Sequence, residues 1–340
     1  MTQPARSTLP VLDLSRLDAG PQERQAFLDD LRTATHEVGF FYLVGHGVPA
    51  ELTAELLSVA RRFFALPEQD KLAIENVNSP HFRGYTRVGG ERTQGAADWR
   101  EQIDIGPERP AVPRGDGVPD WERLEGPNQW PDALPDLREV VGRWDAQLTA
   151  VGLRLLRAWA VSLGQPENVF DAAFAERPST LIKIVRYPGR ADEESTQGVG
   201  AHKDSGVLTL LLVEPGKQGL QVRHGDGWID APPMEGAFVV NIGELLEVAT
   251  GGYLTATVHR VVSPPAGTDR ISVPFFYNPA LSARVPRMEL PPELAAEATG
   301  ITADPDNPIF DTYGANALKS RLRAHPDVAQ AHHADLLARA

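Results

Sequence analysis

Three residues, His202, Asp204 and His259, have the types and the surroundings of metal ligands. His202 and Asp204 lie two residues apart in an apolar, β-prone stretch, Val199–Val213, so on a single strand both side chains project from the same face. A carboxylate in such surroundings is costly unless it has a partner, and a divalent metal is the obvious one. His259 lies in a second β-branched stretch, Ala256–Val262, and supplies a third ligand. Two histidines and one carboxylate are the ligand set of non-haem Fe(II) centres, which leave positions open for co-substrates.

A second group of residues is suited to bind a carboxylate. Arg270 and Ser272 alternate along a strand-like stretch, so they share a face, and a guanidinium fork beside a hydroxyl matches a carboxylate. A 2-oxo acid chelates iron through its own carboxylate and keto oxygen. Its distal carboxylate would then meet Arg270 and Ser272, with Tyr187 as a further candidate donor.

These motifs together resemble the signature of the 2-oxoglutarate/Fe(II)-dependent dioxygenases, and in particular the isopenicillin N synthase-like branch. The metal motif alone is moderately specific, and the ordered series of further matching segments makes the resemblance strong. It covers nearly the whole chain, through the segments Leu9–Leu14, Val38–Val48, Phe63–Leu72, Arg186–Pro188, Asn241–Leu245 and Ser272–Tyr277.

The resemblance implies an enzyme that uses Fe(II), 2-oxoglutarate and O2, with ascorbate as a candidate stimulant. The expected reaction converts 2-oxoglutarate to succinate and CO2 and hydroxylates an aliphatic C–H bond of a small-molecule substrate. Desaturation, ring closure and ethylene formation are alternative outcomes in such families. Asp204 retains its carboxylate, so a halogenase, which has a small residue there, is not expected.

The composition excludes several classes of function. The 340-residue chain has 33 basic and 46 acidic residues, a net charge of −13, which repels nucleic acid and anionic membranes. Hydrophobic residues make up 42%, enough for a sizeable core, but no segment is long and apolar enough to span a bilayer. The absence of cysteine excludes disulfides and thiolate metal sites. We therefore expect a cytoplasmic monomer or small homo-oligomer with neither a nucleic-acid nor a membrane partner.

The periodicity predicts an α+β fold in one compact unit with three segments. Residues 1–177 form a helical and strand region with substrate-lid loops, 178–282 a jelly-roll core, and 283–340 a C-terminal helical extension. The resemblance implies the same architecture, a cupin-like double-stranded β-helix with flanking helices. Helices are predicted at 21–38, 49–66, 136–163 and 313–340, the last broken at His325-Pro326, and strands at 9–14, 40–44, 181–187, 199–213, 220–223, 228–230, 238–242, 257–262 and 270–277.

The stretch from residue 76 to residue 135 is the least regular part of the sequence, rich in Gly, Pro and charge. Long connections of this kind are commonly lids or binding loops, and otherwise spacers. By resemblance the region crosses the mouth of the active site. The candidate substrate-contacting residues are Arg83, Tyr85 and Trp99 within it, and Arg186 and Phe276 outside it.

Two rival functions remain open from the sequence. An Arg-x-Ser pair also occurs in isopenicillin N synthase, where it holds the peptide substrate, so a 2-oxoglutarate-independent oxidase of the same fold is the first rival. Val185 stands where many plant relatives have an Asn two positions before the Tyr, which leaves only Tyr187 to carry over. The second rival is a non-catalytic jelly-roll protein that binds a small carboxylate.

Overall fold

Eight strands form the larger of two main sheets. In the computed structural model, which describes residues 8–174, 177–190, 197–301 and 307–338, their order is β1-β2-β12-β9-β14-β7-β6-β3. Only β1 and β2 are parallel, and all other neighbours are antiparallel. The strands are β1 (Val11–Asp13), β2 (Phe40–Val44), β3 (Gly84–Thr86), β6 (Glu101–Ile105), β7 (Leu181–Pro188), β9 (Leu208–Val213), β12 (Phe238–Ile242) and β14 (Asp269–Tyr277).

The smaller sheet has four antiparallel strands in the order β11-β10-β13-β8. These strands are β8 (Gln197–His202), β10 (Leu220–His224), β11 (Gly227–Asp230) and β13 (His259–Val262), and a separate two-stranded hairpin joins β4 (Arg92–Thr93) to β5 (Ala96–Ala97). The turn between β10 and β11 contains Gly225, whose positive φ of 55° suits glycine. The Gly225-Asp-Gly227 sequence between the two predicted strands is typical of a hairpin turn.

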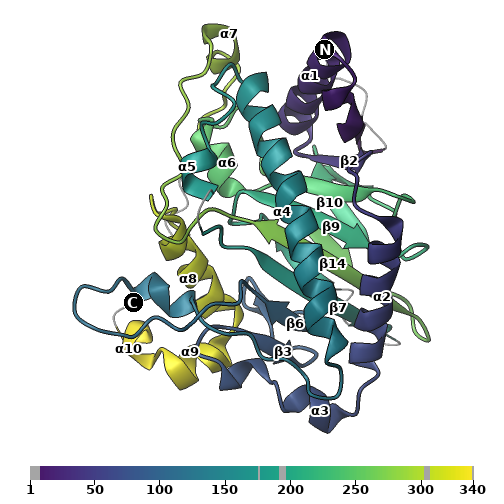
Figure 1. Ribbon diagram of the computed structural model, residues 1–340, viewed down its shortest axis with the longest axis vertical. Coiled ribbons are helices and arrows are strands. Elements are labelled where there is room, and N and C mark those ends of the chain that lie inside the picture. Colours follow the sequence, from purple (N-terminus) through teal and green to yellow (C-terminus); the bar gives the residue numbers. More distant parts are fainter. Residues whose placement is uncertain (1–7, 175–176, 191–196, 302–306, 339–340) are drawn as a thin grey trace.

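Helices cover one face of the larger sheet. Figure 1 shows α4 running across this sheet between α2 and the C-terminal helices. The helices are α1 (Pro21–Glu37), α2 (Ala50–Phe64), α3 (Glu68–Leu72), α4 (Asp136–Ser162), α5 (Asp171–Phe174), α6 (Glu244–Ala249), α7 (Pro292–Ala295), α8 (Tyr313–Ala324), α9 (Pro326–His332) and α10 (Ala334–Leu337), with 3-10 turns at Leu14–Asp18, Asn76–Asn78 and Asp120–Leu124. No helix in the described ranges is both long enough and apolar enough to cross a membrane.

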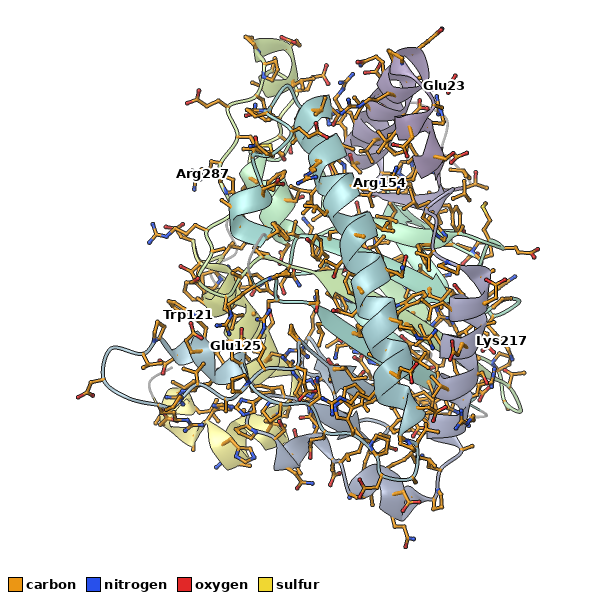
Figure 2. The ribbon with its side chains drawn as sticks, in the orientation of Figure 1. Glu23, Trp121, Glu125, Arg154, Lys217 and Arg287 are labelled. Carbon is orange, nitrogen blue, oxygen red and sulfur yellow. The ribbon has the colours of Figure 1, made fainter. Side chains whose placement is uncertain are left out.

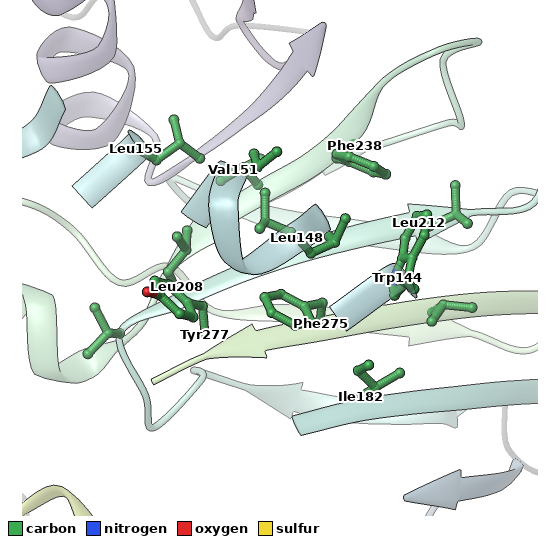
Figure 3. Packing of buried hydrophobic residues seen from close by; sticks show 14 of the residues in the cluster. Trp144, Leu148, Val151, Leu155, Ile182, Leu208, Leu212, Phe238, Phe275 and Tyr277 are labelled. Carbon is green, nitrogen blue, oxygen red and sulfur yellow. The ribbon is translucent and has the colours of Figure 1, made fainter. Parts of the chain in front are cut away.

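Alternation along the strands separates two apolar cores. On β14, Phe275 and Tyr277 point toward α4, where they pack with Trp144 and Leu148 (Figure 3). Apolar residues on the opposite face of the larger sheet form a second cluster with apolar side chains of the smaller sheet. This cluster fills the space between the two sheets. Tyr187 belongs to this inner cluster. The face of β14 that carries Arg270 and Ser272 is thus directed into the interior of the β-sandwich.

Two departures from the predicted elements concern the strands of the main sheets. The stretch predicted as one strand, Val199–Val213, is two strands, because β8 ends at His202 and β9 begins at Leu208. The irregular region from residue 76 to residue 135 contributes β3 and β6 to the larger sheet. β6 is fully buried although three of its five residues are polar, and long-range partners such as Lys71 on Glu101, with 3.0 Å between Nζ and Oε2, make that burial tolerable.

Candidate active site

The three predicted metal ligands lie together at one end of the smaller sheet. His202 and His259 are directly opposite each other on β8 and β13, with ring centroids 4.3 Å apart. The Asp204 Oδ1 atom is 3.6 Å from Nε2 of His202 and 3.8 Å from Nε2 of His259. One ligand atom from each residue lies within 4.8 Å of the other two. Such a group can hold a metal ion from one side and leave its other side open.

Asp204 lies in the loop after β8, and the start of α6 fixes this loop. The backbone N–H of Glu244 donates to the Asp204 carbonyl at 2.8 Å, and the N–H of Leu245 donates to the Gly206 carbonyl at 3.1 Å. Gly243 permits this contact, because a Cβ there would lie 2.2 Å from the Gly206 carbonyl oxygen. The otherwise unpaired N–H groups of a helix start thus hold the loop in place.

Hydrogen bonds orient each side chain of the triad. The Oδ2 atom of Asp204 accepts from Thr209 Oγ1 at 2.6 Å and from Asn241 Nδ2 at 2.7 Å. The ring Nδ1 of His202 lies 2.8 Å from the Gly200 carbonyl oxygen, and that of His259 lies 3.2 Å from the carbonyl oxygen of Thr257. Since a carbonyl only accepts, Nδ1 carries the proton and Nε2 keeps its lone pair for a metal.

The charge states of the triad suit cation binding. Burial alone would raise the pKa of the Asp204 carboxyl, but the two histidines and the Asn241 hydrogen bond hold it well below its usual range. Burial, together with His202, lowers the pKa of His259 to about 4. Burial also opposes protonation of His202, yet the adjacent Asp204 carboxylate outweighs it and raises that pKa. At neutral pH the site therefore offers a carboxylate and at least one neutral imidazole.

Arg270 is a buried cation without a hydrogen-bonding partner among the described residues. Its side chain is 1% exposed, and its Nε, Nη1 and Nη2 atoms make no hydrogen bond in the described structure. Tyr187 lies opposite it on β7, with the Tyr187 ring centroid 4.9 Å from the guanidinium carbon. Ser272 is also buried, two residues along the same face of β14. Burial lowers the pKa of Arg270, but an arginine stays charged at neutral pH, so this position calls for an anion.

A cleft of about 510 Å³ opens beside His202 and Asp204. Phe276, on β14, lines it, as do residues of the β4 strand and of α8. Of the five side chains predicted to contact substrate, Phe276 is the one that the structure places in this lining.

The other four predicted substrate residues lie in other environments. Arg83 is buried and donates from Nη2 to the Leu124 carbonyl at 3.3 Å. Tyr85 donates to Glu101 Oε2 at 2.6 Å, on the helix-covered face of the larger sheet. Trp99 packs under the Arg190 guanidinium, 4.3 Å from its ring centroid. Arg186 bonds to Glu101 Oε1 at 2.8 Å and to Asp269 Oδ2 at 3.0 Å. Each therefore already has a role in packing or in an ion pair.

Sequence reasoning missed the residues that support the triad and those that form the wall of the cleft. Asn241 and Thr209 were noted as parts of matching or apolar segments, and the alternation of β9 and β12 could have placed both beside Asp204. Glu91, Lys183 and Arg321, which line the cleft, come from three distant segments. No local pattern connects these three residues.

Comparisons with known proteins identify the family. The N-terminal model of non-haem dioxygenases in morphine synthesis matches residues 9–133, and the 2OG-Fe(II) oxygenase superfamily model matches residues 178–279. A 2-oxoglutarate-dependent dioxygenase, frbJ of Dothideomycetidae sp. (strain 11243), is 37% identical over 95% of this chain and 91% of its own length. The chain belongs to the 2OG-Fe(II) oxygenase superfamily. The Arabidopsis thaliana homoarginine-6-hydroxylase 2-ODD-C23.2 is 34% identical to this oxygenase, over 84% of this chain and 81% of the relative.

Solved structures share the fold of the oxygenase. JOX2 in complex with 2OG, Fe and JA is 27% identical, with a TM-score of 0.72 over 96% of this chain and 89% of that chain. A full-length Neurospora crassa protein in complex with alpha-KG has a TM-score of 0.74 at 24% identity, over 94% of this chain and 99% of that one. The predicted double-stranded β-helix with flanking helices is thereby confirmed, as is an α+β class.

The predicted activity is confirmed at the level of the reaction class. The oxygenase is an oxidoreductase that depends on Fe(II) and 2-oxoglutarate. The comparisons support this function over both rivals, the 2-oxoglutarate-independent oxidase and the non-catalytic carboxylate-binding protein.

Proposed function

We propose that this oxygenase hydroxylates an aliphatic C–H bond of a small molecule, with His202, Asp204 and His259 as the iron ligands. The observation that carries the proposal is the pairing of an open-sided His–Asp–His cluster with a buried, unpartnered arginine, Arg270. A two-ended anion that binds metal at one end and a guanidinium at the other explains why both features occur in one interior.

The donor set fits Fe(II). Two imidazole nitrogens and one carboxylate oxygen, each oriented by its own hydrogen bond, form a three-ligand face. When bound, the iron supplies the oxidation of the substrate by O2 coupled to decarboxylation of 2-oxoglutarate. The protein residues position the ligands and keep water out, since His259 is 8% exposed and Phe40 packs edge-on against its ring at 5.1 Å.

Arg270 and Ser272 are the proposed anchor for the distal carboxylate of 2-oxoglutarate. The guanidinium offers a bidentate fork, and the buried Ser272 hydroxyl lies on the same strand face. Tyr187 contributes its ring as a cation–π partner of Arg270. Val185 is paired opposite Ser272, so the position of the missing Asn adds an apolar wall there and no donor.

Membership of the superfamily does not determine the primary substrate. The name of the Arabidopsis relative supports hydroxylation as the outcome, and a Dictyostelium discoideum relative, 33% identical, is a probable iron/ascorbate oxidoreductase, which supports ascorbate as a stimulant. The Arabidopsis relative is named for homoarginine and JOX2 is in complex with JA, so the side chains of this cleft must decide the substrate.

We propose that the enzyme acts in the cytoplasm, as a monomer or small homo-oligomer.

An anaerobic titration tests the proposed function. Adding 2-oxoglutarate to the Fe(II)-loaded protein should produce a weak visible metal-to-ligand charge-transfer band, and admitting O2 with ascorbate present should release succinate. Succinate, which lacks the keto oxygen, is the matched control and should give no band. If iron binds but neither the band nor succinate forms, chelation of 2-oxoglutarate at this site is wrong.

Replacing Asn241 with leucine should weaken iron binding without unfolding the protein. The change removes the 2.7 Å hydrogen bond to Asp204 Oδ2 and keeps a side chain of similar size. Partners of this kind are typically worth about 10- to 100-fold in metal affinity, which competition with a coloured Fe(II) chelator measures. Gln221→Leu on β10, whose amide bonds to Asp230, is the control, and equal affinities in the two variants would contradict a supporting role.

A further inference from the structure

The lining of the active-site cleft is rich in positive charge, although the chain as a whole carries −13. The cationic lining residues are Arg92, Arg100, Lys183, Lys203, Arg321 and Arg323, against the carboxylates of Glu91, Asp204 and Glu244. A cleft whose lining carries an excess of one sign of charge concentrates ligands of the opposite sign. The question is which of these cations is available to a ligand.

Nearly all of the cleft cations are already engaged. Lys183 Nζ lies 2.7 Å from Asp104 Oδ1 and 3.1 Å from Glu91 Oε1, and Arg100 Nη2 lies 3.0 Å from Glu91 Oε2. Lys203 pairs with Glu247 at 2.9 Å, Arg323 Nη1 donates to Asn307 at 3.0 Å, and the exposed Arg92 donates to the Gly95 carbonyl at 2.9 Å. Each of these five cations therefore has a partner at 3.0 Å or less, which for Arg92 and Arg323 is a neutral oxygen.

Among the described residues, Arg321 is the mostly buried cleft cation with the weakest pairing. Its side chain is 13% exposed, and the nearest described carboxylate oxygen, Asp104 Oδ1, is 3.9 Å away and already contacts Lys183. This 3.9 Å approach is the one ion-pair contact that its guanidinium makes within the described ranges. Arg83 lies behind it, and burial together with Arg321 lowers the pKa of Arg83 to about 10. Arg321 is therefore the least engaged of the mostly buried cleft cations in the part of the chain that the structure describes.

The position of Arg321 directs this charge toward the reaction site. The preceding residue on α8, Ser320, donates from Oγ to Ser205 Oγ at 3.1 Å, and Ser205 follows Asp204 in the metal-binding loop. Arg321 and His202 line the same cleft. Arg270, by contrast, is buried between the sheets, so the two arginines serve different anions.

We infer that Arg321 binds a carboxylate of the primary substrate, which is therefore a small carboxylic acid. This inference rests on the proposed function and adds the substrate class to it. A planar guanidinium fork matches a carboxylate, and it would hold the remainder of the molecule in the cleft beside the triad. Glu244 also lines this cleft. An acid that also carries an amino group would satisfy both.

A panel of paired compounds tests the inference. Amino acids and alkyl and aryl acids, each matched with its primary amide, are added at saturating 2-oxoglutarate to the Fe(II)-loaded enzyme under anaerobic conditions. Binding is read from perturbation of the charge-transfer band, and turnover from succinate released in air. In the wild type, acids should bind more tightly than their amides. In Arg321→Met the affinity for the acids should fall by about 10- to 100-fold, since a charge-assisted hydrogen bond is lost. Arg321→Lys should retain part of the preference for acids over amides.

Two controls separate this inference from the proposed function. Arg154→Met, on α4 (Figure 2), makes the same change in net charge and should leave the preference for acids intact. Arg321→Met should keep the band with 2-oxoglutarate alone, because Arg270 is untouched. A panel in which no acid outperforms its amide, including one in which nothing binds, overturns the inference, as does an undiminished preference in Arg321→Met. Loss of the band in the wild type would instead contradict the proposed function.

Discussion

Replacing Asp204 with alanine is expected to abolish iron-dependent succinate formation. Asp204 is the anionic member of the triad, and its Oδ1 lies within 3.8 Å of both imidazole Nε2 atoms. Without it, two neutral imidazoles remain, and no ligand charge offsets that of Fe(II). The loss should exceed the roughly 100-fold that removal of a supporting hydrogen bond can cause. Chelator competition measures the iron affinity, and succinate release measures the turnover.

The control for this variant is Asp230→Ala, which removes an exposed carboxylate from β11 of the same sheet. Asp230 bonds to Gln221, so its loss should leave iron affinity and turnover near the wild-type values. Circular dichroism checks that both variants are folded. A full ligand must contribute more than about tenfold to the iron affinity. If the affinity of Asp204→Ala stays within about tenfold of the wild type, the metal binds elsewhere.

The sequence predicted which triad residues come together, although one local assumption was wrong. His202 and Asp204 were expected on one strand, yet β8 ends at His202 and Asp204 lies in the loop. The cluster still forms because β13 brings His259 directly opposite His202, and α6 fixes the loop through backbone hydrogen bonds. The types of the ligands and their order along the chain were enough to predict the triad. The loop that orients the Asp204 carboxylate depends on α6, which is distant in sequence.

Arginine roles were harder to predict because they depend on partners far away in sequence. Arg83 and Arg186 looked like substrate contacts, but the structure gives Arg186 two carboxylates, and Arg83 lies outside the cleft lining. The sequence around Arg321 predicts only a helical tail, and the role proposed for Arg321 depends on its 3.9 Å distance from Asp104. Strand alternation placed Arg270 in the interior, since a period of two is a local property. Pairing of long charged side chains is a global property.

Replacing Arg270 with methionine is expected to weaken 2-oxoglutarate binding severely and to stabilise the ligand-free protein. Truncating one partner of a buried charge pair costs about 2–5 kcal/mol, or roughly 30- to several-thousand-fold in affinity. In the ligand-free chain, however, the guanidinium is 1% exposed, and none of its three nitrogens has a hydrogen-bond partner among the described residues. Removing such a group relieves a desolvation cost of about 1–3 kcal/mol, while methionine fills similar space beside Tyr187.

The opposite signs of these two effects distinguish an anion site from a structural arginine. Urea unfolding without 2-oxoglutarate measures the stability, and the anaerobic band titration measures the affinity. Arg223→Met, on β10, is the control: Arg223 is exposed, bonds to the Gly225 carbonyl and lies 5.5 Å from the Trp228 ring centroid, so its loss should change neither quantity by much. If Arg270→Met lowers stability and leaves the 2-oxoglutarate affinity unchanged, Arg270 supports the sandwich interior and the co-substrate carboxylate binds at another cation. If stability rises as affinity falls, the chain retains a costly buried charge because the co-substrate neutralises it.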